Sequence, residues 1–151
     1  MTEAIFRDSE GLGWQITINY GDILRVMRHV QTPEGKPVDL CRMAETGDIT
    51  PVTANLHTLI KTVYYLLQPD IIDYTGMGGN EAQLWFYDRI DANALEQMST
   101  ALLEAIANFT PSPTVRAAIM TAGELMSKAQ IVTALDILAG QLSESTTTQA
   151  Q

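Results

Sequence analysis

The stretch from Asp91 to Pro113 constrains the fold more than any other part of this chain. Its apolar residues recur at spacings of three and four, which places them in one stripe along a helix of about five turns. The stripe consists of Leu95, Met98, Leu102, Ile106 and Phe109. Asp91 can cap the start of this helix by accepting backbone N–H groups. The sequence Thr-Pro-Ser-Pro at 110–113 ends it, because a residue before proline avoids the helical region.

Ser112 and Pro113 predict the cap and the first residue of a second helix, since proline suits the first helical position. The two helices therefore meet in a corner. Each presents one apolar face, so both have to pack against something.

Length and composition indicate a single globular domain, because 151 residues with 46% hydrophobic content can bury a sizeable core. The net charge of −9 argues against nucleic acid and anionic membranes as partners, since both attract basic surfaces. The single cysteine excludes an internal disulfide bond. We find no signal peptide and no apolar run of about 18 residues. We therefore expect a cytoplasmic protein.

Periodicity along the chain predicts a mainly α fold in which a small N-terminal β-hairpin packs on a bundle of about five to six helices. The hairpin strands are expected at 4–7 and 14–18, with the Trp14 face directed toward the helices. The expected helices span 20–30, 38–45, 50–68, 81–89, 91–109 and 113–138. Pro69 is expected to end the third of these helices, and 70–80 to be irregular. We expect one domain over 1–142 and a disordered polar tail over 143–151.

Residues that could carry catalysis or bind a metal form no recognisable set. The Gly-Met-Gly-Gly sequence at 76–79 lacks both the Gly-Lys-Ser/Thr ending and the preceding apolar strand of a phosphate-binding loop. His29 and His57 have no CxxC or HxxxH partner that would complete a zinc site. Asp70 and Asp73 follow a proline, where aspartates are ordinary turn residues.

A nucleophilic pair of Cys41 and His57 stays open from sequence alone. Cys41 lies among apolar positions of a helix, where an inert thiol is the more frequent case. We therefore expect no enzymatic activity, no cofactor and no metal site.

The two apolar stripes in the rear half of the chain offer a second interpretation. Such stripes are usually core, but methionines adapt to irregular partner surfaces, and a groove between helices can receive another helix. The candidate partner-binding residues are Leu95, Met98, Leu102, Ile106, Phe109, Ile119 and Met126.

Several motifs follow one another in a distinctive order. The hairpin ends in Trp-x-Ile-x-Ile (14–18), and Gly-Asp-Ile-Leu-Arg-Val (21–26) comes next. Val-Asp-Leu (38–40) then enters a short helix, and a later helix contains Val-Tyr-Tyr-Leu-Leu-Gln-Pro (63–69). The set closes with Asp-Ala at 91–92, Ala-Leu-Leu-Glu-Ala-Ile at 101–106 and Phe-x-Pro-Ser-Pro at 109–113. In this order the chain resembles the small tail assembly chaperones of long-tailed bacteriophages.

The resemblance covers residues 4–119, while the loop at 31–37 and the helical pattern after Ala122 are longer than expected. It implies a non-enzymatic viral protein that acts in virion assembly in the host cell cytoplasm. The implied partner is the helical tape-measure protein, which the chaperone keeps soluble, and the tail tube protein is a second candidate partner. We expect copies of the chain to associate along this client, because one small domain cannot cover a long helix.

Two alternatives belong to other classes of protein. An acidic inhibitor of a basic nucleic-acid-binding protein would array its carboxylates on one face, whereas here they are scattered along the chain. A small enzyme would use Cys41 or the region of His57.

Overall fold

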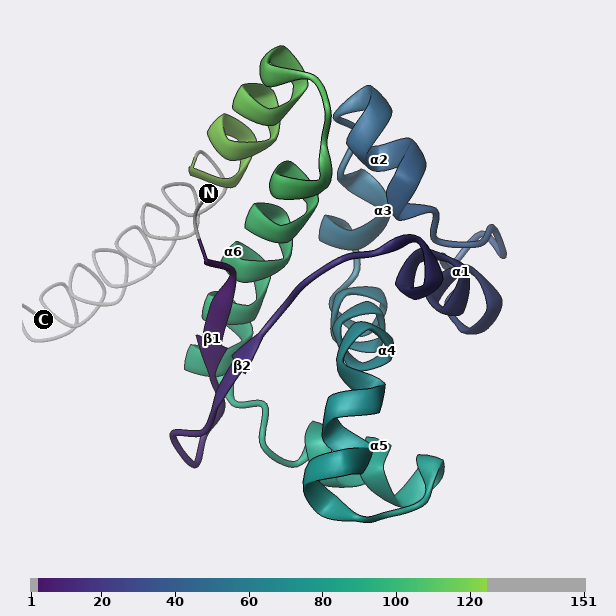
Figure 1. Ribbon diagram of the computed structural model, residues 1–151, viewed down its shortest axis with the longest axis vertical. Coiled ribbons are helices and arrows are strands. Elements are labelled where there is room, and N and C mark those ends of the chain that lie inside the picture. Colours follow the sequence, from purple (N-terminus) through teal and green to yellow (C-terminus); the bar gives the residue numbers. More distant parts are fainter. Residues whose placement is uncertain (1–2, 125–151) are drawn as a thin grey trace, which may run out of the picture. The chain divides into compact units, whose positions relative to one another are not determined.

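The structure is a computed structural model that describes residues 3–124 (Figure 1). The chain divides into two units, Met1–Met120 and Thr121–Gln151, and the first contains every element discussed below. The fold is mainly helical, with a small N-terminal two-stranded sheet packed against the helices, as predicted. The predicted domain over 1–142 continues past the described residues, and the tail over 143–151 lies outside them. The elements are β1 (Ile5–Arg7), β2 (Gly13–Gln15), α1 (Tyr20–His29), α2 (Leu40–Thr46), α3 (Thr50–Thr53), α4 (Leu56–Thr75), α5 (Gly79–Tyr87) and α6 (Ala92–Phe109).

The two strands are antiparallel, with Phe6 opposite Trp14, and both of these side chains are buried. Both strands are shorter than predicted. Their pairing ends at the hydrogen bond from the N–H of Ile16 to the carbonyl of Ala4. The predicted alternation nevertheless continues past the end of β2, where Ile16 is buried and Thr17 is exposed. The sheet lies along α6, and the chain then crosses to α1 (Figure 1).

Helix α1 begins where the sequence predicts, because Asn19 and Asp22 form a capping box. The side-chain oxygen of Asn19 accepts the N–H of Asp22 at 2.9 Å, and the Asp22 carboxylate accepts the N–H of Asn19 at 3.0 Å. This reciprocal pair satisfies backbone N–H groups that a helix start leaves without a partner. Helix α2 is likewise capped by Asp39 and ends at Gly47, which has a φ of 78°.

The predicted helix that starts at Thr50 is in fact two helices. Asn55 is extended, with φ −144° and ψ 123°, and its side chain accepts the N–H of Thr58 at 3.1 Å. Asparagine is a favoured N-cap, and here it closes off α3 and starts α4. The apolar stripe runs across Asn55 without a break, so periodicity alone predicted a single helix.

The prediction that Pro69 ends this helix is also wrong, because α4 continues through Pro69 to Thr75. Proline removes the N–H that would bond to the carbonyl of Tyr65, four residues earlier. A guanidinium nitrogen of Arg25 on α1 donates to that carbonyl at 2.9 Å instead. Residues 70–75 are therefore helical, where an irregular segment was predicted, and the Tyr65 carbonyl keeps a hydrogen-bond partner.

The glycine-rich segment is a tight connection between α4 and α5. Gly76 ends α4 with a φ of 69°, a conformation that suits glycine. Helix α5 starts at Gly79 and ends at Tyr87, so it lies about two residues earlier than predicted.

The corner after α6 agrees with the prediction. Asp91 caps α6 by accepting the N–H of Ala94 at 2.8 Å, and the hydroxyl of Ser112 accepts the N–H of Val115 at 3.3 Å. Residues 113–120 are helical. Arg116 in this helix donates to carbonyls at the end of α6, at 3.1 and 3.0 Å. The two helices of the corner are thus tied together by hydrogen bonds that the sequence does not reveal.

Candidate functional site

Most of the predicted partner-binding residues lie in the core. Four of them are at most 1% exposed: Met98, Leu102, Ile106 and Ile119. Leu95 and Phe109 are partly exposed, and Met126 lies outside the described residues. The stripe of α6 is covered because β1, α2 and α4 all pack against this helix. Phe109, at the C-terminal end of α6, is partly exposed and lines a groove.

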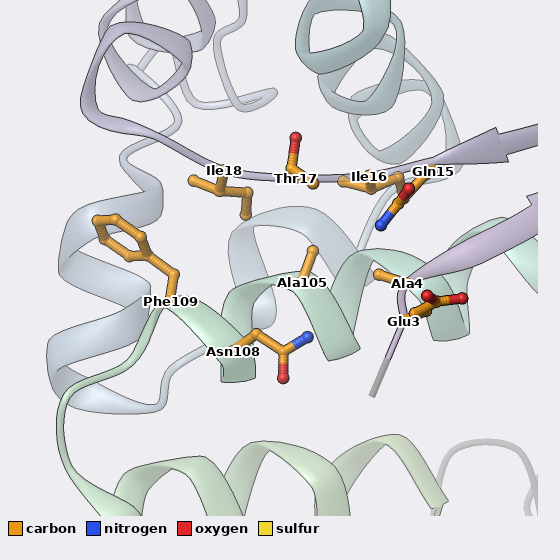
Figure 2. Close-up of a pocket in the computed structure, with 9 residues that line it drawn as sticks. All are labelled: Glu3, Ala4, Gln15, Ile16, Thr17, Ile18, Ala105, Asn108 and Phe109. Atoms are coloured by element: carbon orange, nitrogen blue, oxygen red, sulfur yellow. The ribbon is translucent and has the colours of Figure 1, made fainter. Parts of the chain in front are cut away.

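Phe109 lines a groove between the end of α6 and the segment that leaves β2, which we call the hairpin groove (Figure 2). Its volume is about 400 Å³. The apolar lining residues are Ala4, Ile16, Ile18, Ala105 and Phe109. Figure 2 shows the Phe109 ring beside Ile18 and the Ala105 methyl group directed toward the segment 15–18.

The hairpin groove combines a buried apolar floor with a partly exposed rim. Ala4, Ile16 and Ala105 are at most 3% exposed and form the floor, whereas Ile18 and Phe109 are partly exposed. The exposed Glu3 lines the end of the groove next to Ala4. This arrangement can take a few apolar side chains of a partner. Its lining residues include no histidine or cysteine that could act as an acid, base or nucleophile.

A second groove, the α4–α5 groove, has a volume of about 550 Å³. It is lined by His57, Ile60, Lys61, Gln83, Leu84, Tyr87 and Ile90. Leu84 is 66% exposed and contributes apolar surface to this groove. The Gln83 side chain donates to the Tyr87 hydroxyl at 2.7 Å, and burial raises the pKa of that hydroxyl. None of the predicted partner-binding residues lines this groove, but His57, which the small-enzyme alternative would use, does.

The residues considered for chemistry stay apart from both grooves, except His57. The Cys41 thiol donates to the Glu45 carboxylate at 3.7 Å. Burial raises the pKa of Cys41, and the negative charge of Glu45 raises it further. A raised pKa keeps the thiol protonated, which is the opposite of an activated nucleophile.

The two histidines lie in different surroundings. His29 stacks on Tyr65 with ring centroids 4.6 Å apart, and His57 is exposed at the start of α4. Among residues 3–124, no three histidine, cysteine, aspartate or glutamate side chains lie close enough together to hold a metal ion.

An ion pair between the buried Asp8 and the partly exposed Arg89 was not predicted from the sequence. Their side chains meet at 2.7 Å, and the Asp8 carboxylate also accepts the indole N–H of Trp14 at 3.1 Å. The Arg89 guanidinium lies 4.5 Å from the ring centroid of Trp85. Burial alone raises the pKa of Asp8, but the hydrogen bonds from Arg89, Trp14 and the backbone outweigh burial and lower the pKa below its ordinary value.

This ion pair joins the hairpin turn to the end of α5, 81 residues away in the sequence. The Asp-Ser-Glu-Gly turn at 8–11 predicts only the local bonds of Asp8, since an aspartate that opens a turn often bonds to the following N–H groups. It does so here, to Glu10 and Leu12. The pairing with Arg89 leaves no trace in sequence spacing.

Comparison with known proteins gave no match, whether against protein-family models, curated proteins or solved structures. In the part of the chain that the structure describes, no helix has both the length and the apolar character that crossing a membrane requires.

Proposed function

We propose that this chain is a non-enzymatic phage tail assembly chaperone, which binds the helical tape-measure protein and keeps it soluble in the host cell cytoplasm. The observation that carries the proposal is the hairpin groove, where Ile18 and Phe109 present apolar surface over a buried floor. The ordered motifs over 4–119 support the same function.

The groove accounts for binding in physical terms. A client helix exposes apolar side chains at spacings of three and four, and such a stripe can insert into an apolar groove. Each apolar side chain that becomes fully buried contributes roughly 1.5–3 kcal/mol. A few such contacts suffice for a reversible complex, which suits a protein that has to release its client.

The charge of the chain accounts for solubility. The net charge of −9 is carried by a domain of only 16.6 kDa. A complex coated with such domains repels other complexes, so exposed client surface stays out of aggregates.

The experiment that tests the proposal is co-expression with a tape-measure protein from a long-tailed phage genome that encodes this chain. The expected result is that the client is soluble only with the chain and that the two co-purify. Ile18→Asp should abolish co-purification, because it places a charge in the groove. Tyr20→Asp is the matched control, because Tyr20 is 65% exposed and lies outside the groove.

Two outcomes would overturn the proposal. One is a client that is equally soluble with and without the chain. The other is recovery of the chain with a basic nucleic-acid-binding protein in place of the tape-measure protein, which would favour an acidic inhibitor.

A further inference from the structure

The outer edge of β2 leaves backbone groups available for pairing. The N–H of Ile16 donates to the carbonyl of Ala4 at 2.7 Å, so the even-numbered residues of this strand pair with β1. Backbone groups alternate in direction along an antiparallel strand, so those of Gly13, Gln15 and Thr17 point away from β1. All three residues are exposed, and within residues 3–124 their N–H and C=O groups have no hydrogen-bond partner.

This open edge is longer than β2 itself. Burial alternates from Trp14 to Thr17, as in an extended segment with one covered face. Figure 1 shows the chain running on from β2 toward α1 without a turn, and Asn19, just before α1, is also extended, with φ −119° and ψ 175°. Residues 13–17 therefore form one continuous edge, along which the outward-facing residues are about 7 Å apart.

An exposed aromatic surface lies beside the edge. Tyr74, in the last turn of α4, is 63% exposed, and its ring centroid lies 6.0 Å from that of the buried Trp14. Trp85 on α5 is partly exposed and lies 5.9 Å from Tyr74. Phe6, the neighbour of Trp14 on β1, contacts Phe86 instead. Tyr74 and Trp85 therefore lie on the side of Trp14 that is away from β1, and we call them the aromatic shelf.

We propose that the outer edge of β2 binds an extended segment of a partner protein, which adds a third strand to the sheet. The unpaired backbone groups identify the conformation of the partner, because an extended chain offers N–H and C=O groups at the same spacing, whereas a helix has already bonded its own. The aromatic shelf identifies the pattern, because successive side chains of a strand point to opposite faces. Every second side chain of the partner is apolar and contacts Tyr74 or Trp85.

Charge narrows the class of partner further. The Arg89 guanidinium beside Trp85 is already paired with Asp8 at 2.7 Å, so it is not available to an acidic residue of the partner. The net charge of −9 also repels acidic segments. The partner segment is therefore neutral or basic.

The inference does not rest on the proposed function, because an extended chain at this edge and a helix in the hairpin groove are different ligands. Residues 15–17 border the groove as well, so the test uses the full chain without a client. Binding at the edge and binding of the tape-measure protein are then measured separately, and either can fail alone.

Fluorescence titration with a synthetic peptide tests the proposal, because Trp14 and Trp85 both lie at the site. The probe is Lys-Thr-Val-Thr-Ile-Thr-Val-Thr-Lys, whose apolar residues alternate, and it should bind saturably. A peptide of the same composition with its three apolar residues placed together should bind about tenfold more weakly. The probe N-methylated at its three central residues should lose at least as much, because it lacks the N–H donors.

Variants of the edge test the same bonds from the side of the protein. Gln15→Pro removes an outward N–H that the fold does not use, and proline is tolerated where an edge N–H faces solvent. It should weaken probe binding about tenfold or more, whereas Gln15→Ala keeps the N–H and should bind like the wild type. Thr17→Pro is a second variant of the same kind.

Variants of the aromatic shelf test the side-chain contacts. Tyr74→Ala should weaken binding of the probe about tenfold, because the apolar residues of the peptide lose their contact surface. Tyr74→Phe is the matched control, since it keeps the ring, and it should bind like the wild type.

Circular dichroism establishes which variants are folded, and the N-methylated peptide tests the backbone bonds even where a proline variant is not. A probe that does not bind at millimolar concentration would overturn the proposal. So would equal binding of the rearranged or N-methylated peptide, or folded proline variants that bind like the wild type. A wild-type dimer that Gln15→Pro dissociates would also overturn it, because a second copy would then occupy the edge.

Discussion

The guanidinium of Arg25 lies 2.9 Å from the carbonyl oxygen of Tyr65 and supplies the hydrogen bond that Pro69 cannot make. The same nitrogen is 3.1 Å from the Asp22 carboxylate, which belongs to the capping box of α1. One side chain therefore links the start of α1 to the middle of α4. Without it, the Tyr65 carbonyl would lose its partner inside a packed helix pair.

Replacing Arg25 tests this relationship. Arg25→Met should lower the free energy of unfolding by about 1–2 kcal/mol, since the Tyr65 carbonyl loses a charged donor. In a Pro69→Ala background the restored N–H can bond to the same carbonyl, so Arg25→Met should cost less there. Urea unfolding of the four proteins in this cycle measures the difference. Equal costs in both backgrounds would show that the bond to Tyr65 contributes nothing.

The Asp8–Arg89 pair predicts a loss of stability in acid. The pKa of Asp8 is lowered in the folded state, so its contribution is present above the unfolded pKa and is lost as pH falls through the folded pKa. Asp8→Asn should destabilise the domain by about 2 kcal/mol or more at neutral pH, because Arg89 loses its partner. The variant should also unfold with a weaker pH dependence in the acid range. Urea midpoints measured from neutral to strongly acidic pH test both points. Equal midpoints at neutral pH would contradict the first, and parallel curves for variant and wild type would contradict the second.

Leu102 and Phe109 should respond differently to the same substitution. Leu102 is fully buried, so Leu102→Asp should cost ~3 kcal/mol or more. Phe109 is partly exposed, so Phe109→Asp should cost less than half as much, because its charge can reach water. Thermal melts of both variants check the comparison. Equal losses would show that Phe109 belongs to the core and not to the partly exposed rim of the hairpin groove.

Two buried threonines provide a matched pair. The hydroxyl of Thr62 is buried with no hydrogen-bond partner, so Thr62→Val should stabilise the protein by about 1 kcal/mol. The hydroxyl of Thr110 donates to the carbonyl of Ala44 at 2.9 Å and is also 3.1 Å from that of Ile106. Thr110→Val should therefore destabilise by about 1–2 kcal/mol. Urea unfolding measures whether each variant is more or less stable than the wild type. A change of stability in the same direction for both variants would contradict the hydrogen-bond partners described for the two hydroxyls.

Signals that act over a few residues predicted much of the fold. The caps at Asn19, Asp91 and Ser112 start helices where expected, since a cap depends on backbone groups two or three positions away. The alternation around Trp14 correctly gave the buried face of the hairpin. Asn55 is the same kind of cap, but the apolar stripe runs across it and predicts one uninterrupted helix.

The candidate site was much harder to predict than the fold. A stripe at helical spacing shows that one face of α6 is apolar, but not whether the cover is β1, another helix or a partner. The structure covers Met98, Leu102 and Ile106 with other elements. The exposure of Leu84 could not be predicted either, because it depends on how α5 packs against α4.

The sequence by itself determined that this chain is acidic and mainly helical, with an N-terminal hairpin and a corner of two helices after Phe109. These properties follow from composition, from periodicity and from caps within a few residues. Only the tertiary structure decided that α4 continues through Pro69, that Asp8 is buried against Arg89, and that Phe109 lines the hairpin groove. Each of these depends on contacts between residues far apart in the chain, which spacing along a sequence does not encode.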